Sequence, residues 1–307
     1  MAEKHYNTMN DFLRNTFGSK VFKVSLNAGF SCPNKDGTKG YGGCIFCSPS
    51  GSGDFAGDIG ETLASQFKAI KTRMHEKWPE AKYIAYFQAN TNTYAPADTL
   101  RTLYDKALNL DENVVGLSIG TRADCVDESV IDVLESLHKR TYLQVEIGLQ
   151  SMHEKTAKRI NRGHDLATFD DAVKRLRKRG INVVVHIING FPWEDKDAML
   201  ETVDHLGNLD IQGIKIHMLH ITKNTALGNE YLANPFPLLT LEEYVDITIE
   251  QIRRLHPDVI VQRVTGDAAK DDLIAPQWTL KKFVVMNEID KRMRKERLVQ
   301  GDLYSSR

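Results

Sequence analysis

The stretch Val21-Phe22-Lys23-Val24-Ser25-Leu26-Asn27 is typical of a β-strand, and the loop that follows it contains Cys32, Cys44 and Cys47. The cysteines have the spacing C-x₁₁-C-x₂-C, and the glycines among them make the loop flexible enough to fold around a small object. Because thiolates are the usual ligands of iron–sulfur clusters, we expect a [4Fe–4S] cluster held by three cysteines, with one iron left open.

Other uses of these cysteines remain open at this point. A structural zinc site is almost always closed by four protein ligands, but the nearest histidines in the sequence are His5 and His75. The chain begins without the pattern of a signal peptide, so we expect a cytoplasmic protein in a reducing compartment, where disulfides are rare. Buried packing is a third reading, and it is the one that we favour for Cys125, which lies far from the others.

Length and composition favour an enzyme-sized globular chain. It has 307 residues, of which 41% are hydrophobic, enough for one large core. No apolar run has the length of a membrane span, so we expect no membrane partner. The net charge of −1 argues against a general polyanion binder. Basic stretches at 155–162, 174–179 and 291–297 fit either solvated helix faces or contacts with nucleic acid.

Segments with strand character alternate with segments of helical periodicity along the chain. Strands are expected at 21–27, 83–88, 115–119, 142–149, 182–188, 214–219 and 259–264. Helices are expected at 59–77, 98–109, 128–140, from 153, and at 168–179, 195–209, 240–255 and 279–298. The alternation predicts an α/β fold with parallel strands, a partial or full (β/α) barrel with a C-terminal helical extension. We expect an N-terminal extension over 1–20, the barrel over 21–265 and the helical extension over 266–307.

Polar residues follow most of the expected strands. In barrels of this kind the chemistry lies at the carboxyl ends of the strands, where all of these residues and the cysteine loop would converge. They are Gln88, Asn90, Asn92, Thr121, Arg122, Gln150, Ser151, Asn189, Gly190, His217 and His220. On the sixth strand, Lys215, His217 and Leu219 share one face and Ile216, Met218 and His220 the other, so only one of the two sets can face the lumen.

The cysteine loop after a first barrel strand, with Phe46 before the last thiol, resembles the radical S-adenosylmethionine (SAM) superfamily. The usual spacing there is C-x₃-C-x₂-C, whereas the long first gap resembles the catalytic subunit of Elongator. The segments at 150–151, 161–164 and 186–192 also resemble that subunit in order and spacing. The segments at 86–94 and 262–267 resemble the bacterial YhcC/YtqA-type radical SAM family over nearly the whole chain. We expect no counterpart of the acetyltransferase-like domain of the Elongator subunit, so chemistry that depends on that domain is not carried over.

The resemblance implies a [4Fe–4S] cluster on Cys32, Cys44 and Cys47 and SAM as the second cofactor. It implies that Arg162 binds the SAM carboxylate and Gln150 a ribose hydroxyl, with Gln88 and Asn90 at the amino group. Phe46, His186 and Gly190 would lie near the adenine, and Thr121 completes the set. Glu146 inside the fourth strand needs a partner, and SAM is one candidate. Each of three residues has an alternative role that does not involve SAM: loop packing for Phe46, a surface position for Arg162 and a core position for His186.

Kinship to the Elongator subunit points to a tRNA substrate, with a change to the C5 side chain of the wobble uridine. A flavodoxin- or ferredoxin-type protein would donate the electron. The same chemistry on a small metabolite or tetrapyrrole is the second reading, and the near-neutral charge favours it. A metal-stabilised module that binds RNA or a partner without catalysis is the third.

Overall fold

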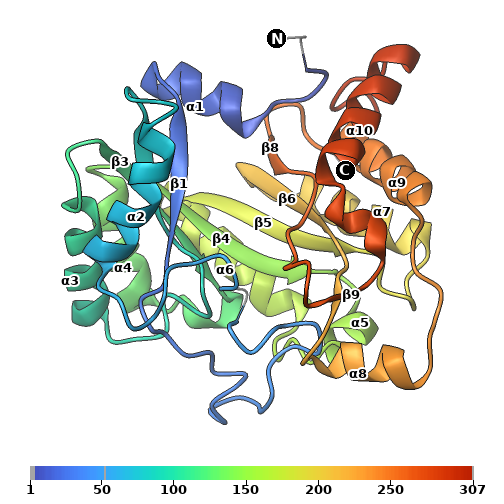
Figure 1. Ribbon diagram of the computed structural model, residues 1–307, viewed down its shortest axis with the longest axis horizontal. Coiled ribbons are helices and arrows are strands. Elements are labelled where there is room, and N and C mark those ends of the chain that lie inside the picture. The colour runs from blue at the N-terminus through green and yellow to red at the C-terminus, as the bar shows by residue number, and fades with distance from the viewer. Residues whose placement is uncertain (1–3, 52, 306–307) are drawn as a thin grey trace.

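A computed structural model describes residues 4–51 and 53–305. Its main feature is a curved sheet of seven parallel strands in the order β1-β2-β3-β4-β5-β6-β8 (Figure 1). The strands are β1 (Val21–Leu26), β2 (Lys82–Phe87), β3 (Val114–Thr121), β4 (Tyr142–Gln150), β5 (Asn182–Asn189), β6 (Gly213–Met218) and β8 (Ile260–Arg263). The prediction of seven parallel strands in chain order is therefore confirmed.

The barrel is partial, because β1 and β8 are the two edges of the sheet and do not pair with each other. The N-terminal helix α1 (Met9–Phe17) packs against both edge strands, and a bridge between Thr8 and Val261 attaches its start to β8. Helix α1 was not predicted, because its short amphipathic pattern lies in the segment that we treated only as an extension.

The other helices lie mostly on the outer face of the sheet, except α8, which packs against the short strand β7 (Ile221–Thr222) and the cysteine loop (Figure 1). They are α2 (Leu63–His75), α3 (Ala97–Leu108), α4 (Glu128–His138), α5 (Glu154–Arg159), α6 (Leu166–Lys178), α7 (Lys196–Gly207), α8 (Ala226–Ala233), α9 (Leu241–Arg254) and α10 (Lys282–Glu296). None of the helices within 4–51 and 53–305 combines the length and apolar character that crossing a bilayer requires.

Alternation along each strand decides which side chains enter the barrel. In β4, Leu143, Val145 and Ile147 are fully buried in the main hydrophobic core. The intervening positions Gln144 and Glu146 face the other side, as the two-residue period of a strand requires. Since this inner face carries polar groups in a sheet whose outer face is apolar, the interior of the barrel is built for ligands rather than for packing.

Several boundaries differ from the predicted ones for local reasons. Helix α2 begins at Leu63 rather than at 59, because the Thr62 hydroxyl accepts a hydrogen bond from Ser65 N and caps the helix there. Helix α10 begins at Lys282 because the preceding residues, Gln277–Leu280, form a 3₁₀ turn after Pro276. Helix α8 and the two short antiparallel strands β7 (Ile221–Thr222) and β9 (Leu273–Ala275) were not predicted.

These unpredicted elements support the cysteine loop. Ile221 and Leu227 belong to a second, smaller hydrophobic cluster, and Ile45 and Phe46 of the loop pack against it. Leu227 N donates a hydrogen bond to Ile45 O at 2.9 Å, and Ile45 N donates to Ile160 O at 3.0 Å. The last two cysteines are therefore held by main-chain bonds from both sides.

A buried amide pair fastens the end of β5 to two helices. The Asn189 and Gln251 side chains exchange hydrogen bonds of 2.8 and 2.9 Å, and Gln251 Nε2 also donates to Met199 O at 3.0 Å. Both amides are almost fully buried, so each bond satisfies a group that water cannot reach. Asn189, which the sequence placed among the polar strand ends, thus has a structural partner.

The amide pair yields a stability prediction. Gln251→Leu should lower the free energy of unfolding by about 2–3 kcal/mol, because it leaves the Asn189 amide and the Met199 carbonyl buried without a partner. Denaturant unfolding measures the change. Gln277→Leu, at an exposed glutamine, is the control and should change stability by less than about 0.5 kcal/mol. Equal stability of both variants would show that the pair contributes nothing.

Candidate functional site

A cavity of about 780 Å³ opens inside the partial barrel. Its lining includes Cys32, Cys44 and Cys47 together with residues from the inner faces and carboxyl ends of the strands. The convergence that the sequence predicted for the cysteine loop and the strand ends is therefore present in the structure.

Turns and side chains hold the cysteine loop in shape. Lys35 N and Asp36 N donate to Cys32 O at 2.8 and 3.1 Å, and Cys47 N donates to Cys44 O at 2.9 Å. The Asn161 amide, which follows α5, donates to Gly43 O at 2.8 Å. All three cysteines line the cavity, together with other residues of the loop such as Lys35 and Phe46.

The protein alone disfavours an ionised thiol at Cys44. Burial, reinforced by the neighbouring Cys47, raises the pKa of Cys44 to about 12. Arg122 is the positive side chain that acts against this rise. Because the thiolate is the form that binds metal, bound iron must supply most of the charge that keeps the Cys44 sulfur ionised.

Arg122 stands beside the thiols in a fixed orientation. Its Nε and Nη2 donate to the two oxygens of Asp124 at 2.9 and 3.0 Å, and Lys39 Nζ lies 2.9 Å from the same carboxylate. Burial alone would raise the pKa of Asp124, but Arg122 and Lys39 hold this pKa at about 2. Arg122 therefore remains charged and positioned, and its nearest electrostatic partners in the loop are Cys32 and Cys44.

The arrangement does not match a single-ion site. Within the described part of the chain, no group of three or more His, Cys, Asp or Glu side chains is gathered closely enough to hold one metal ion. A zinc ion with bonds of about 2.3 Å would draw its sulfurs within roughly 4 Å of one another. A cluster instead places each thiolate on a different iron, so a donor set of three thiols that line the same cavity fits the cluster.

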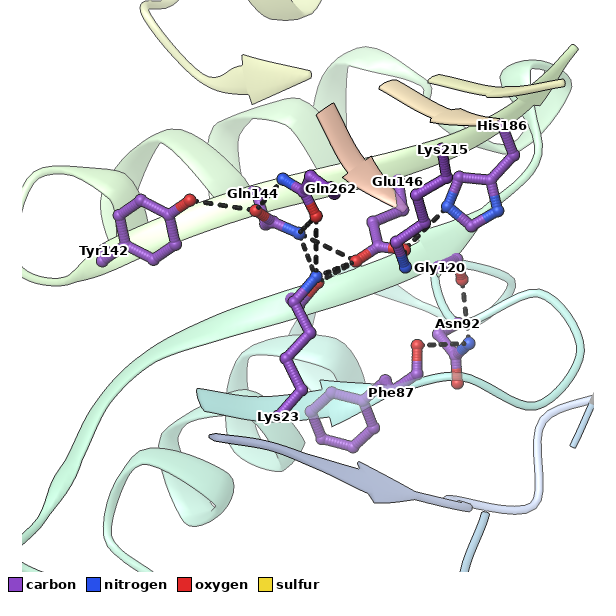
Figure 2. A network of polar contacts seen from close by, with 11 residues as sticks. Lys23, Phe87, Asn92, Gly120, Tyr142, Gln144, Glu146, His186, Lys215 and Gln262 are labelled. Atoms are coloured by element: carbon purple, nitrogen blue, oxygen red, sulfur yellow. Dashed lines mark hydrogen bonds and ion pairs between the residues drawn. The ribbon is translucent and has the colours of Figure 1, made fainter. Parts of the chain in front are cut away.

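A second polar group lies deeper in the barrel around Glu146 of β4, whose side chain is fully buried (Figure 2). Lys23 Nζ of β1 lies 2.6 Å from Oε1, and His186 Nε2 of β5 lies 2.7 Å from Oε2. Lys215 of β6 also donates to Oε2. Ser118 and Gln144 complete the shell with bonds of 2.5 and 2.8 Å to Oε1.

The charges of this group are strongly coupled. Burial alone would raise the pKa of Glu146, but Lys215 and Lys23 hold this pKa well below its usual range. Burial lowers the pKa of Lys215 to about 7, with Glu146 opposing and Lys23 assisting the fall. Burial and then the charge of Lys215 lower the pKa of His186 to about 4. His186 is therefore neutral at pH 7 and donates its Nε2 proton to the carboxylate.

Six of the nine residues expected to contact SAM lie on the cavity wall. They are Phe46, Gln88, Asn90, Thr121, Glu146 and His186. Phe46 also packs on Phe191, with ring centroids 6.1 Å apart. Both oxygens of Glu146 already accept bonds from protein donors, which supplies the partner that the sequence required for this buried carboxylate.

Arg162 is buried rather than on the surface, with only 1% of its area exposed. Its Nη1 donates to Leu149 O and Ser151 O at 2.7 Å each, and its Nε donates to His164 O at 3.0 Å. Nη2 makes no hydrogen bond within the described residues. The surface alternative for this arginine is therefore wrong, and three of its bonds fix the backbone that follows β4.

Gln150 and Gly190 lie where the backbone turns at the ends of β4 and β5. Gln150 has φ 61°, after a register shift in the pairing of β4 with β5, and Gly190 has φ 102°. A left-handed backbone at a non-glycine residue is costly and is typical of functional sites. Neither residue appears among the described residues that line the cavity, and the same holds for Arg162.

Lys23 and Tyr86 were not singled out from the sequence. Both side chains line the cavity, and the Tyr86 ring lies 5.2 Å from Lys23 Nζ and 4.8 Å from Lys215 Nζ. The signal that could have found Lys23 is its place between apolar neighbours in a strand. On β6, Lys215 and His217 line the cavity, whereas Ile214 and Ile216 are fully buried in the core. Met218, Leu219 and His220 all line the cavity as well, so the expected division into two faces holds only as far as His217.

Comparison with protein families covers most of the chain. Residues 37–206 match the Radical SAM superfamily, and residues 211–295 match the Radical_SAM C-terminal domain. The fold agrees: the archaeal Methanocaldococcus infernus Elp3 structure superposes with a TM-score of 0.68 at 16% identity, covering 92% of this chain and 64% of that one.

Individual relatives give the same placement. The chain is 49% identical to the uncharacterized protein YtqA of Bacillus subtilis, over 99% of this chain and 94% of that protein. It is 38% identical to the protein YhcC of Escherichia coli K12, over 97% of this chain and 95% of that protein. Elongator complex protein 3 of Saccharomyces cerevisiae is more distant, at 26% identity over 50% of this chain and 28% of that protein. The chain thus belongs to the radical SAM superfamily, in the group that contains YtqA and YhcC, and its cofactors are a [4Fe–4S] cluster and SAM.

Proposed function

We propose that this radical SAM enzyme acts on tRNA and changes the C5 side chain of a wobble uridine. The observation that carries the proposal is the similarity of half of the chain to Elongator complex protein 3, joined to a cavity large enough for a single base. The protein would work in a reducing cytoplasm and take its electron from a flavodoxin- or ferredoxin-type donor.

Each cofactor has residues suited to it. Cys32, Cys44 and Cys47 would hold the cluster, with Arg122 offsetting the negative charge of the thiolates. When bound, the cluster and SAM supply a 5′-deoxyadenosyl radical inside the cavity. Phe46, Gln88, Asn90, Thr121 and His186 would surround SAM from the walls, and Phe46 with Phe191 would exclude water from one side.

Gln150, Arg162 and Gly190, which do not line the cavity in the described structure, have a different proposed role. Arg162 has one unused donor, Nη2, which is the atom available for the SAM carboxylate. Its other nitrogens and the turns at Gln150 and Gly190 shape the strand ends against which SAM would rest.

The basic stretches differ in their access to the cavity. Lys155 and Lys158 of α5 are exposed at the carboxyl ends of the strands, next to the cysteine loop. In α6, by contrast, Arg175 and Arg179 form ion pairs with acidic neighbours. The basic end of α10 lies near the N-terminus, where Lys4 pairs with Asp290, at the opposite end of the strands. We therefore propose that tRNA phosphates lie along α5, and that a base unstacked from the RNA enters the cavity.

The cluster assignment predicts which cysteine variants lose the iron–sulfur cluster. Alanine at Cys32, Cys44 or Cys47 should abolish the iron–sulfur absorbance of anaerobically reconstituted protein, because each thiolate holds one iron. Cys125→Ala should keep it, because that thiol does not line the cavity in the described structure. Iron and sulfide analysis measures the outcome, and loss of the cluster in the Cys125 variant alone would contradict the ligand assignment.

Arg162→Lys separates SAM binding from strand support. If Nη2 binds the SAM carboxylate, the dissociation constant for SAM should rise about tenfold or more, within the range of about 1.5–3 kcal/mol for a bond to a charged group. Equilibrium binding to cluster-loaded protein measures it. If the variant loses thermal stability and yet binds SAM as the wild type does, Arg162 only supports the backbone.

The tRNA proposal predicts a local effect of charge. Lys155→Glu with Lys158→Glu should weaken binding of bulk tRNA and reduce the slope of log affinity against log salt by about 1.5–2, because two phosphate contacts are lost. Lys291→Glu with Lys295→Glu, at the far end of α10, is the matched control and should bind as the wild type does. Both double variants should cleave SAM as the wild type does when no tRNA is added.

The same experiment decides between the two substrate classes. Wild-type SAM cleavage should change on addition of bulk tRNA, since a substrate that consumes the radical couples cleavage to its own reaction. If tRNA neither binds nor affects cleavage, the substrate is a small metabolite or tetrapyrrole, and the lysines of α5 are ordinary solvated surface.

A further inference from the structure

Carboxylates at the cavity wall are shared by more than one cation. Glu146 lies between Lys23 and Lys215, and Asp267 lies between Arg263 and Lys282. A buried charge normally has its own counter-charge. In each of these groups one positive charge therefore has no carboxylate of its own.

The whole lining shows the same imbalance. Among the described residues that line the cavity, seven are lysine or arginine and four are aspartate or glutamate. Arg122 is paired with Asp124, which is not in this lining, so six cationic and four acidic side chains remain. The cofactors do not correct it: three thiolates on a doubly positive cluster leave one negative charge, and the single net positive charge of SAM cancels that charge. A third ligand group with negative charge would complete the balance.

Lys215 has unused donors that face this space. Its side chain lines the cavity, and the residue is only 7% exposed. Among the described residues it makes one hydrogen bond, to Glu146, and one cation–π contact, with the Tyr86 ring. An ammonium group carries three donors, so two N–H groups of a nearly buried lysine remain for a ligand.

We propose that Lys23 and Lys215 form a subsite for an oxyanion, a carboxylate or a phosphate, of a ligand that enters the cavity. Glu146 is the positioning residue of this subsite, because its two carboxylate oxygens hold the two ammonium groups inside the barrel (Figure 2). The subsite rests on the cavity being the radical SAM site and not on tRNA being the substrate.

The ionisation of Lys215 makes the subsite sensitive to pH. The titratable and charged groups that face it from the surrounding strands are Lys23, Tyr86, Glu146, His186, His217 and Arg263. Burial, with Lys23 and Arg263 adding to it, lowers the pKa of Lys215 to about 7. The ammonium form predominates below that pH, so an anion should bind more tightly in mild acid and take up a proton as it binds.

The test is anomalous diffraction from crystals of the cluster-loaded full chain grown with sodium bromide. Bromide should give an anomalous peak within contact distance of both Nζ atoms at a pH of about 6. At a pH of about 8.5 the occupancy should fall about tenfold, because Lys215 is then largely neutral. Absence of a peak at this lysine pair at the lower pH overturns the proposal.

Variants separate a built subsite from general attraction. Lys215→Met should abolish the peak, Lys215→Arg should retain it, and Lys68→Met, at an exposed lysine of α2, should have no effect. Lys215→Met with Glu146→Gln removes one charge of each sign, so it checks the result if the single variant folds poorly. A peak that persists at full occupancy in Lys215→Met contradicts the proposal.

Adding SAM to the crystals assigns the oxyanion to its source. If the bromide peak persists with SAM bound, the subsite belongs to the substrate. If SAM displaces bromide, and the dissociation constant for SAM rises about tenfold in Lys215→Met, the carboxylate of SAM occupies it. Both results support the subsite. Displacement of bromide without any change in SAM affinity in the variant would contradict it.

Discussion

The ion pairs of Glu146 join strands that the sheet itself leaves apart. Strands β1 and β8 are the two edges of the sheet and do not pair with each other, yet Lys23 of β1 bonds both Glu146 of β4 and Gln262 of β8, the latter at 3.0 Å (Figure 2). Lys215 brings β6 to the same carboxylate. Because these side chains meet inside the barrel, its curvature is fixed by polar contacts across the lumen as well as by main-chain pairing, and the cavity above them keeps its shape.

This construction explains the polarity of the interior. A closed hydrophobic barrel would fill its lumen with packed side chains. Here the inner face of β4 carries Gln144 and Glu146, which form a floor with Gln262 and Lys23. The cysteine loop closes the other side of the cavity and is held by α5, α8 and the β7–β9 pair. The cysteine loop and the polar floor thus line the same cavity.

The strand order and the place of the cysteine loop could be predicted from sequence because both depend on local patterns. Apolar runs of strand length alternate with helical periodicity, and three cysteines in one glycine-rich loop are rare without a cofactor. Helix α8 and strands β7 and β9 could not be predicted, because their short segments are stabilised by tertiary contacts: the pairing of β7 with β9 and packing in the cluster that contains Phe191 and Phe46. The partners of Glu146 come from sequence positions up to 123 residues away, so only the folded sheet brings them together.

Arg162 shows where residue chemistry alone is insufficient. An arginine fork suits a carboxylate, and that reasoning pointed to SAM, but the fork is largely occupied by the main chain after β4. The spacing of residues along the sequence indicates which type of side chain lies near a site. Which hydrogen-bond donors of that side chain stay free depends on its tertiary contacts.

The claim that the enzyme modifies tRNA is tested most directly by comparing nucleosides from tRNA of cells with and without this protein. Without it, one modified wobble uridine should decrease, and a uridine with a different C5 side chain should accumulate in its place. Identical nucleoside profiles from the two strains would contradict the tRNA assignment.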